Sequence, residues 1–222
     1  MTEVVGVDGY PGGWVTVALE DGRFASAGAF ATFQEVLTAH PDAQAIGIDM
    51  PIGLPTAPER RRADLEAKAF VGPRHRSVFT TCPLVVLEAP TYQAALTRCK
   101  EMTGRGLSAQ AYGLARKILE LDRIADGRVW EVHPEVSFCA LAGRPLATGK
   151  ETYNGLMARL GLLRSAGIRL PSDLARTGRA RADDVLDAAV AAWTAQRIAD
   201  GTAKSLPHPP ERIGDRQVAI WY

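Results

Sequence analysis

The chain has 222 residues, of which 46% are hydrophobic, and its 26 basic and 25 acidic side chains leave a net charge of +1. This length and composition allow a substantial buried core, which excludes intrinsic disorder and favours a single domain over 1–222. The balanced charge gives no global signature for nucleic acid or for an anionic membrane, so any anion-binding surface has to be a local patch.

Cysteine usage and hydropathy both predict a cytoplasmic protein. Cys82, Cys99 and Cys139 are odd in number and lack C-x-x-C spacing, which argues against a disulfide framework and against a thiolate zinc site. No apolar run approaches the roughly 20 residues that span a bilayer, and the acidic, strand-like N-terminus is unlike a signal peptide. We therefore expect no membrane partner, while the oligomeric state is left open.

The first fifty residues are rich in strand-forming patterns. Short β-rich runs at 4–8, 14–20 and 23–30 are separated by glycine-containing turns, which predicts an antiparallel meander. A helix is expected at 31–39. The unbroken apolar run at 45–53 then predicts a central strand, buried on both faces and parallel to the first.

The next segment predicts an insertion over about 54–107. Arg, Glu and Ala dominate 58–71, which indicates a solvated helix that includes Arg60–Arg62. Prolines and glycines are scattered through 72–107, which indicates irregular structure with one helix at 91–102.

The second half alternates helices with one short strand. Ser108 is a good N-cap for a helix that runs to about 125, and "RVWEVHPE" supplies a strand that ends before Pro134. Further helices are expected at 135–141, 150–166 and 182–200.

Acidic residues stand at or near the end of three predicted strands. These residues are Asp8, Asp49 and Glu131, and the last lies one residue before its strand ends. If the strands are parallel neighbours, their acids converge at the carboxyl edge of the sheet, where open α/β sheets place their sites. Asp184 and Asp187 are three residues apart and share one face of the last helix.

Such a cluster predicts a divalent cation. Facing carboxylates repel one another, and Mg²⁺ or Mn²⁺ is the natural compensating ion because hard cations prefer oxygen ligands. A purely structural role is the alternative for each acid alone, since Asp often starts a turn after a strand or caps a helix. That reading suits Asp183 or Asp184, whereas Asp187 lies too far into the helix.

Other polar residues are candidates for supporting roles. His133 and Glu135 could act as a proton shuttle or an outer-shell partner, or else Pro134 fixes His133 in a turn and Glu135 favours the next helix N-terminus. Arg74 and Arg76 follow the solvated helix in a segment that suits a phosphate-contacting loop.

Two glycine-containing segments are weaker signals. "GRPLATGKET" at 143–152 fails the phosphate-loop pattern, because Arg144 and Glu151 stand where that pattern needs Gly and Ser or Thr. The turn at 9–13 satisfies no dinucleotide fingerprint, and its glycines are expected to let a ligand backbone approach Asp8.

The motifs together resemble a known family. "GVDGYPGGWV", "IDMPIGLP", "GPRHRSVF", "KILELD", "VWEVHPEVSF", "GLMARLGLL", "DDVLDAAVAAWTA" and "AIWY" resemble, in order and over nearly the whole chain, a family of unknown function whose members are predicted to be ribonuclease H-like nucleases. The resemblance implies an α/β fold of RNase H-like type, with a five-stranded mixed sheet flanked by helices. Its first three strands are antiparallel and its last two parallel to the first.

The acids are similar to those of Holliday-junction resolvases. Asp8 matches the acid on the first strand, Asp49 matches the acid at the end of the fourth, and Asp184 with Asp187 matches an Asp-x-x-Asp-Ala helix. Asp49 departs from the Glu usual there. Lys117 lies within "KILELD", which makes it a candidate outer-shell residue, although a helical pair with Glu120 is the simpler reading.

The resemblance implies a metal-dependent nuclease that acts on nucleic acid or a nucleotide. Catalysis would use two Mg²⁺ or Mn²⁺ ions held by five acids. The alternatives are a phosphotransferase of the actin-like and sugar-kinase superfamily, or a non-catalytic nucleic-acid-binding protein of the same fold. The expected ligands are Asp8, Asp49, Glu131, Asp184 and Asp187.

Overall fold

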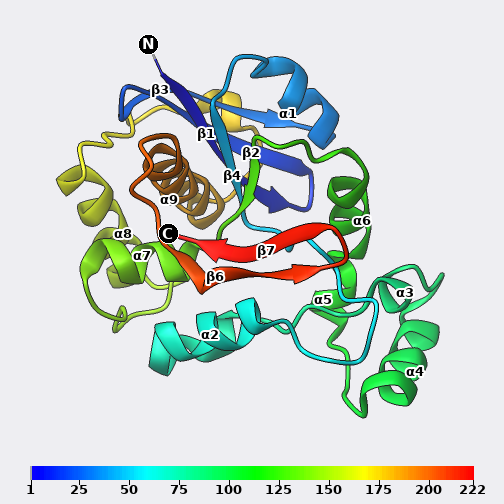
Figure 1. Ribbon diagram of the computed structural model, residues 1–222. Helices are drawn as coiled ribbons and strands as arrows, with labels where there is room; N and C mark the ends of the chain where they lie inside the picture. The colour runs from blue at the N-terminus through cyan, green and yellow to red at the C-terminus, as the bar shows by residue number, and fades with distance from the viewer. Residues whose placement is uncertain (1) are drawn as a thin grey trace.

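The computed structural model describes residues 2–222, and its centre is a five-stranded mixed sheet flanked by helices (Figure 1). The strand order is β3-β2-β1-β4-β5. Neighbours β1, β2 and β3 pair antiparallel, while β4 pairs parallel with β1 and β5 parallel with β4. The predicted meander and central parallel strand are thus confirmed. The strands are β1 (Glu3–Tyr10), β2 (Gly13–Glu20), β3 (Arg23–Phe30), β4 (Ala45–Ile48) and β5 (Val129–Glu131).

Nine α-helices, counted over residues 2–222, surround the sheet. Two short 3₁₀ segments accompany them, at Gly72–Ser77 and Ala175–Thr177. None of these helices is both long and apolar enough to cross a membrane. The α-helices are α1 (Phe33–Ala39), α2 (Arg62–Val71), α3 (Leu84–Leu87), α4 (Tyr92–Thr103), α5 (Ala109–Gly113), α6 (Ala115–Ile124), α7 (Pro134–Ala142), α8 (Tyr153–Ser165) and α9 (Ala182–Ala199).

The alanine-rich helix α9 packs against one face of the sheet at very short range. A Cβ atom on Gly6 of β1 would lie 1.9 Å from the Ala188 carbonyl oxygen, and one on Gly47 of β4 would lie 2.7 Å from that of Ala191. Any side chain at Gly6 or Gly47 would therefore push the helix away. The opposite face of the sheet packs against α1 and α6, with Val5, Ile46 and Ile118 in one apolar cluster.

Several predicted boundaries are wrong for physical reasons. The apolar run at 45–53 forms a strand only over Ala45–Ile48, since Pro51 follows and cannot donate to a ladder. The helix expected at 58–71 begins at Arg62, and Arg61 is buried rather than solvated. The helix expected after Ser108 is broken into α5 and α6 at Leu114, although Ser108 Oγ does accept the Ala111 amide as predicted.

A C-terminal hairpin completes the chain and was not predicted. It consists of β6 (Ser205–Ile213) and β7 (Arg216–Trp221), paired antiparallel as a separate two-stranded sheet. Three prolines in "SLPHPPERI" argue against a strand in sequence analysis, because proline removes a backbone donor. A parallel bridge joins Val132 to Trp221, so the hairpin continues next to the edge strand β5.

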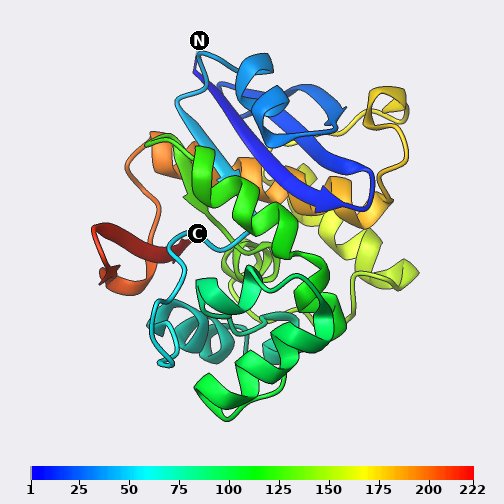
Figure 2. The ribbon, with the colours of Figure 1, turned by 90° about the vertical axis from the view of Figure 1, so that its right-hand side faces the viewer.

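The segment 54–107, expected as an insertion, lies beyond the carboxyl ends of β1 and β4. Both ribbon views place its helices α2, α3 and α4, and the following α5, on that side of the sheet, away from the N-terminus (Figures 1 and 2). The segment therefore covers the edge at which the acidic residues emerge.

Candidate functional site

Strands β1 and β4 place Asp8 and Asp49 side by side. Val7 pairs with Ile48 in the parallel ladder, and the Asp49 amide donates to the Val7 carbonyl at 3.1 Å. Because Gly6 and Gly47 face α9, strand alternation turns the Asp8 and Asp49 side chains toward the same helix. Asp8 lies inside β1, opposite Val15 of β2, rather than at the exit of the strand as predicted.

Helix α9 brings a third carboxylate to this edge. The carbonyl of Ala188 lies over Gly6 of β1, so the preceding residue, Asp187, lies near Asp8, whose pKa it raises. Asp187 in its second turn is 2% exposed, and its Oδ2 accepts a hydrogen bond from Lys150 Nζ. We call Asp8, Asp49 and Asp187 the acid cluster.

The acid cluster is short of positive charge. Burial raises the pKa of Asp8 well above its ordinary value, and repulsion by Asp49 and Asp187 raises it further. Burial also raises the pKa of Asp49, and it raises that of Asp187 to about 7 against the opposing effect of Lys150. Partial burial alone would lower the pKa of Lys150, but the three aspartates raise it. One ammonium group does not neutralise three carboxylates.

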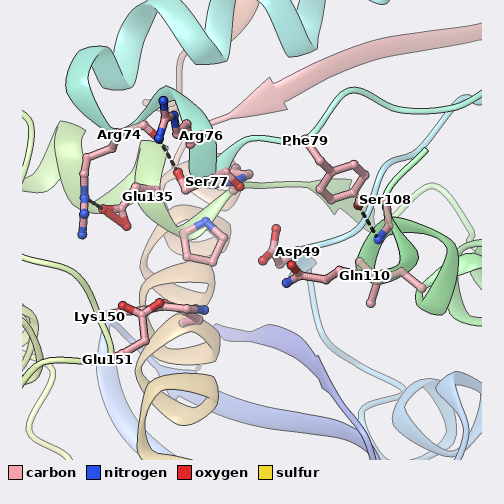
Figure 3. A pocket seen from close by; sticks show the side chains of 15 residues that line it. Asp49, Arg74, Arg76, Ser77, Phe79, Ser108, Gln110, Glu135, Lys150 and Glu151 are labelled. Carbon is pink, nitrogen blue, oxygen red and sulfur yellow. Dashed lines mark hydrogen bonds and ion pairs between the residues drawn. The ribbon is translucent and has the colours of Figure 1, made fainter. Parts of the chain in front are cut away.

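A cavity of about 520 Å³ opens over the acid cluster. Figure 3 places Arg74, Arg76 and Ser77 on one side of Asp49, and Phe79, Ser108 and Gln110 on the other. The cavity is lined by Asp49, Arg74, Arg76, Ser77, Phe79, Ser108, Gln110, Ala111, Leu114, His133, Pro134, Glu135, Lys150, Glu151 and Asp187.

Comparison with known proteins adds one finding. The family model described as "Protein of unknown function (DUF429)" matches residues 6–212, which include the whole acid cluster and Lys150. The chain belongs to the DUF429 family. Searches of curated proteins and of solved structures each gave no match.

Glu131 does not join the acid cluster. It pairs with Ile48 in the ladder, one position before Asp49, and a shift of one residue turns a strand side chain to the opposite face. There it forms a buried ion pair with Arg61, which also binds Asp64, and accepts the Ile52 amide at 2.7 Å. The position of Glu131 near the end of its strand predicts a place beside Asp49, but the register of the ladder turns its side chain to the other face.

Asp184 and Lys117 also have structural partners. The Asp184 carboxylate accepts the Arg181 amide at 2.9 Å at the start of α9, which is the capping alternative. Its charge still reaches Asp8, whose pKa it raises. Lys117 lies on the opposite face of the sheet, beneath Gly9, where its ammonium binds the Gly13 carbonyl and lies 4.3 Å from the Trp14 ring centroid.

Glu135 and Arg74 belong to a network that fixes the loop before α8. The Glu135 carboxylate binds Arg159 at 2.7 and 2.8 Å and Arg74 at 3.2 Å. Both guanidinium groups also donate to the Thr148 carbonyl, at 2.7 Å from Arg74 and 3.2 Å from Arg159. These contacts hold the backbone two residues before Lys150, so Glu135 and Arg74 position the loop that carries it.

His133 and Arg76 remain available in the cavity. His133 Nε2 lies 3.3 Å from the Ser77 carbonyl, and its buried Nδ1 has no partner among residues 2–222. Arg76 is exposed and forms no ion pair with any residue of that range. The prediction of a phosphate-contacting loop therefore suits Arg76 better than Arg74.

Sequence analysis missed Lys150 and Phe79 as site residues. Lys150 lies in "GRPLATGKET", a segment that fails the phosphate-loop pattern and so gives no other signal of a site. Phe79 ends the "GPRHRSVF" motif, in which the basic residues are the stronger signal. In both cases the available signal was a chemically distinctive residue in a loop, but its distance from the acids in the chain hid the connection.

The glycines after Asp8 do not open the site. A Cβ at Gly9 would lie 2.9 Å from Met50 Cε and 3.2 Å from Lys117 Cδ, on the face away from the acid cluster. Gly13 has φ of +140°, and a Cβ there would lie 2.0 Å from the Phe30 carbonyl oxygen. Close packing against the backbone thus requires the glycine at 13, whereas the missing Cβ of Gly9 faces away from the acid cluster and does not widen access to Asp8.

The donor chemistry of the cluster fits a hard cation. The Asp49 carboxylate accepts no hydrogen bond from residues 2–222, and the Asp8 carboxylate accepts one, from the Gly9 backbone amide at 2.8 Å. Within that range no group of three or more His, Cys, Asp or Glu side chains is arranged to hold a metal ion. Two carboxylates with free acceptor oxygens still suit Mg²⁺, which takes its remaining ligands from water and substrate phosphate.

Proposed function

We propose that this protein is a divalent-metal-dependent nuclease with an RNase H-like fold. The observation that carries the proposal is the convergence of buried Asp8 and Asp187 with partly exposed Asp49, undercompensated in charge, beneath a cavity with cationic side chains on its wall. The sheet order, with three antiparallel strands followed by two parallel to the first, supports the RNase H-like assignment. The free thiols Cys82, Cys99 and Cys139 suit a cytoplasmic location.

In this proposal Asp8 and Asp49 would hold Mg²⁺ or Mn²⁺, while Asp187 beside them stays paired with Lys150. Such an ion, when bound, activates a water and stabilises the leaving oxygen of a phosphodiester. Lys150 and Arg76 face the same cavity and place positive charge where phosphate would lie. The Glu135 network keeps Lys150 in place.

His133 is the proposed proton carrier of the site. It is the histidine that lines the cavity, and it lies close enough to Asp49 to lower the pKa of that carboxyl. Imidazole accepts and releases protons near neutral pH. The unpartnered Nδ1 is free to hold a proton when Nε2 engages a neighbour.

A metal-dependent cleavage screen tests the proposal. Purified protein is incubated with single-stranded, duplex and branched DNA and with RNA, each with Mg²⁺, Mn²⁺ or a chelator. We expect metal-dependent cleavage of at least one substrate and a loss of at least about 100-fold in Asp8→Asn, because removing even an outer-shell partner costs roughly 10–100-fold. Asp200→Asn is the matched control, since Asp200 lies at the far end of α9 and bonds Gln196.

The other outcomes separate the alternatives. Cleavage that is equally fast in Asp8→Asn would exclude the acid cluster as the catalytic site. Calorimetric binding of Mg²⁺ without cleavage of any substrate would favour a non-catalytic nucleic-acid-binding protein. Thermal stabilisation by ATP, rather than by oligonucleotides, would favour a phosphotransferase.

A further inference from the structure

The two walls of the cavity differ in chemistry, and the acid cluster lies between them (Figure 3). One wall carries the cationic side chains of Arg74, Arg76 and Lys150, with Glu135 and Glu151 among them. Glu135 is neutralised by Arg74 and Arg159, and Lys150 is paired with Asp187, so Arg76 is the cation of this wall with no ion pair among residues 2–222. The opposite wall carries an aromatic ring, an amide and apolar side chains: Phe79, Gln110, Ala111 and Leu114.

Phe79 presents a partly exposed ring to the cavity. Its side chain is half-buried, and no aromatic residue among 2–222 stacks on it, although five aromatic pairs occur elsewhere in that range. An aromatic ring beside cationic groups is a stacking platform for nucleobases, because every base has a π-face. Phe79 therefore offers a place for a base next to the place for a phosphate.

Gln110 is placed to form hydrogen bonds with the edge of such a base. It is exposed in the first turn of α5 and lines the cavity, and its side-chain carboxamide makes no hydrogen bond with the described part of the chain. A carboxamide provides both a donor and an acceptor. The insertion and α5 supply this wall, whereas the sheet and α9 supply the acids.

The size of the cavity limits what can use both walls. About 520 Å³ is within the usual range for one small ligand, which is roughly 300–1,000 Å³. A base inside a duplex is stacked and paired, so it cannot lie on Phe79 unless it leaves the stack. A nucleotide without a pairing partner meets no such obstacle.

We propose that the cavity binds one unpaired nucleotide, with its phosphate between Arg76 and Lys150 above the acid cluster and its base against Phe79. The inference rests on the same site as the proposed nuclease and names its substrate class. The nucleotide can belong to a single-stranded nucleic acid or be a free nucleoside monophosphate, since both present the same phosphate and unpaired base. Base-paired duplex is excluded as the preferred ligand.

Equilibrium binding tests this inference without any need for cleavage. The probes are a single-stranded 12-nucleotide DNA containing 2-aminopurine, the same sequence closed into a hairpin duplex, and a nucleoside monophosphate as competitor. Binding is measured with Ca²⁺ and with a chelator, and stacking on an aromatic ring is read as quenching of 2-aminopurine. We expect the single strand to bind at least about 10-fold more tightly than the duplex and to be quenched.

Variants test which wall of the cavity contacts the base and which contacts the phosphate. Phe79→Ala and Phe79→Leu should each weaken single-strand binding about 10-fold and remove the quenching, while Phe79→Tyr retains both because it keeps the ring. Arg76→Ala should lower affinity and reduce the salt slope by about one. Arg164→Ala is the control, since Arg164 is exposed on α8 and outside the cavity lining. Circular dichroism melting verifies that each variant folds.

Each outcome decides the inference. Single-strand preference with dependence on the Phe79 ring supports it for a polymer, and binding of the monophosphate alone, with the same dependence, supports it for a free nucleotide. Equal binding of duplex, unchanged affinity in Phe79→Ala, or no binding of any probe overturns it. Single-strand binding without metal-dependent cleavage would overturn only the nuclease proposal. Cleavage that needs Asp8 but ignores Phe79 would overturn only this one.

Discussion

Two clusters of charged side chains lie near the carboxyl edge of the sheet, and they differ in how fully their charges are paired within the protein. In the first, Arg61 binds Glu131 and Asp64, and the carboxylates also accept the Ile52 and Thr81 amides at 2.7 Å each. In the second, the acid cluster has a single lysine and one backbone donor. Buried charge is tolerated when it is paired and hydrogen-bonded. The charges around Arg61 are paired within the protein, and we call this group the closed cluster. The acid cluster keeps carboxylate oxygens without a partner, which a ligand could bind, and we call it the open cluster.

The largest expected effect comes from breaking the closed cluster. Arg61→Met leaves two buried carboxylates without their cation, and we expect a loss of about 3–5 kcal/mol in the free energy of unfolding. At roughly 2–4 °C per kcal/mol for a chain of this size, the midpoint of thermal unfolding should fall by about 6–20 °C. Differential scanning calorimetry measures the change.

The neighbouring residue supplies a matched control. Arg62 also pairs with an acid, Glu66, at 2.9 Å, but its side chain is 58% exposed whereas that of Arg61 is 0% exposed. Arg62→Met should change stability by only about 0.3–0.5 kcal/mol. Equal effects at the two positions would contradict the view that burial makes the Arg61 cluster essential.

Removing a charge from the open cluster should raise the free energy of unfolding, whereas removing one from the closed cluster lowers it. Asp8→Asn removes a buried carboxylate that Asp49 and Asp187 repel, so the metal-free protein should become more stable by about 1–2 kcal/mol, although the proposed activity is lost. The variant should also lose the stabilisation that Mg²⁺ gives the wild type, since only ligand bound to the folded state stabilises it. Thermal melts with chelator and with Mg²⁺ measure both. A lower melting temperature in chelator would mean that Asp8 is structural.

How far the sequence predicts this arrangement depends on whether the contacts are local. Asp8 and Asp49 could be paired from sequence because each follows an apolar run, and parallel strands align their ends. Glu131 could not be placed, because its face depends on a register that only the assembled β4–β5 ladder defines. Arg61 sits among charged neighbours typical of a solvated helix, and its burial results from the Glu131 side chain 70 residues away.

The site shows the same limit. Lys150 and Phe79 reach the acids through loops whose paths are set by long-range contacts: the Arg159–Glu135–Arg74 network for one, and the packing of the insertion for the other. Neither loop has a periodic pattern that would locate it. The role of the glycines after Asp8 is not local either, since the atoms nearest to Gly9 and Gly13 include those of Met50 and Phe30 in other segments.

The smallest expected effect is a pH dependence of stability in the metal-free protein. The pKa of Asp187 is about 7 in the folded state and lies near 4 when the chain is unfolded, so between these values the folded state holds more protons. Stability therefore falls as pH rises through about 7, and from pH 6 to pH 8 this residue contributes a loss of roughly 1 kcal/mol.

The change is measured as the difference between the wild type and Asp187→Asn, each unfolded by urea in chelator at pH 6, 7 and 8, so that groups titrating alike in both proteins cancel. A flat difference would mean that Lys150 alone keeps Asp187 ionised. Added Mg²⁺ should flatten the wild-type profile as well, because a cation on the open cluster favours the ionised carboxylates and supplies the charge that the closed cluster already has in Arg61.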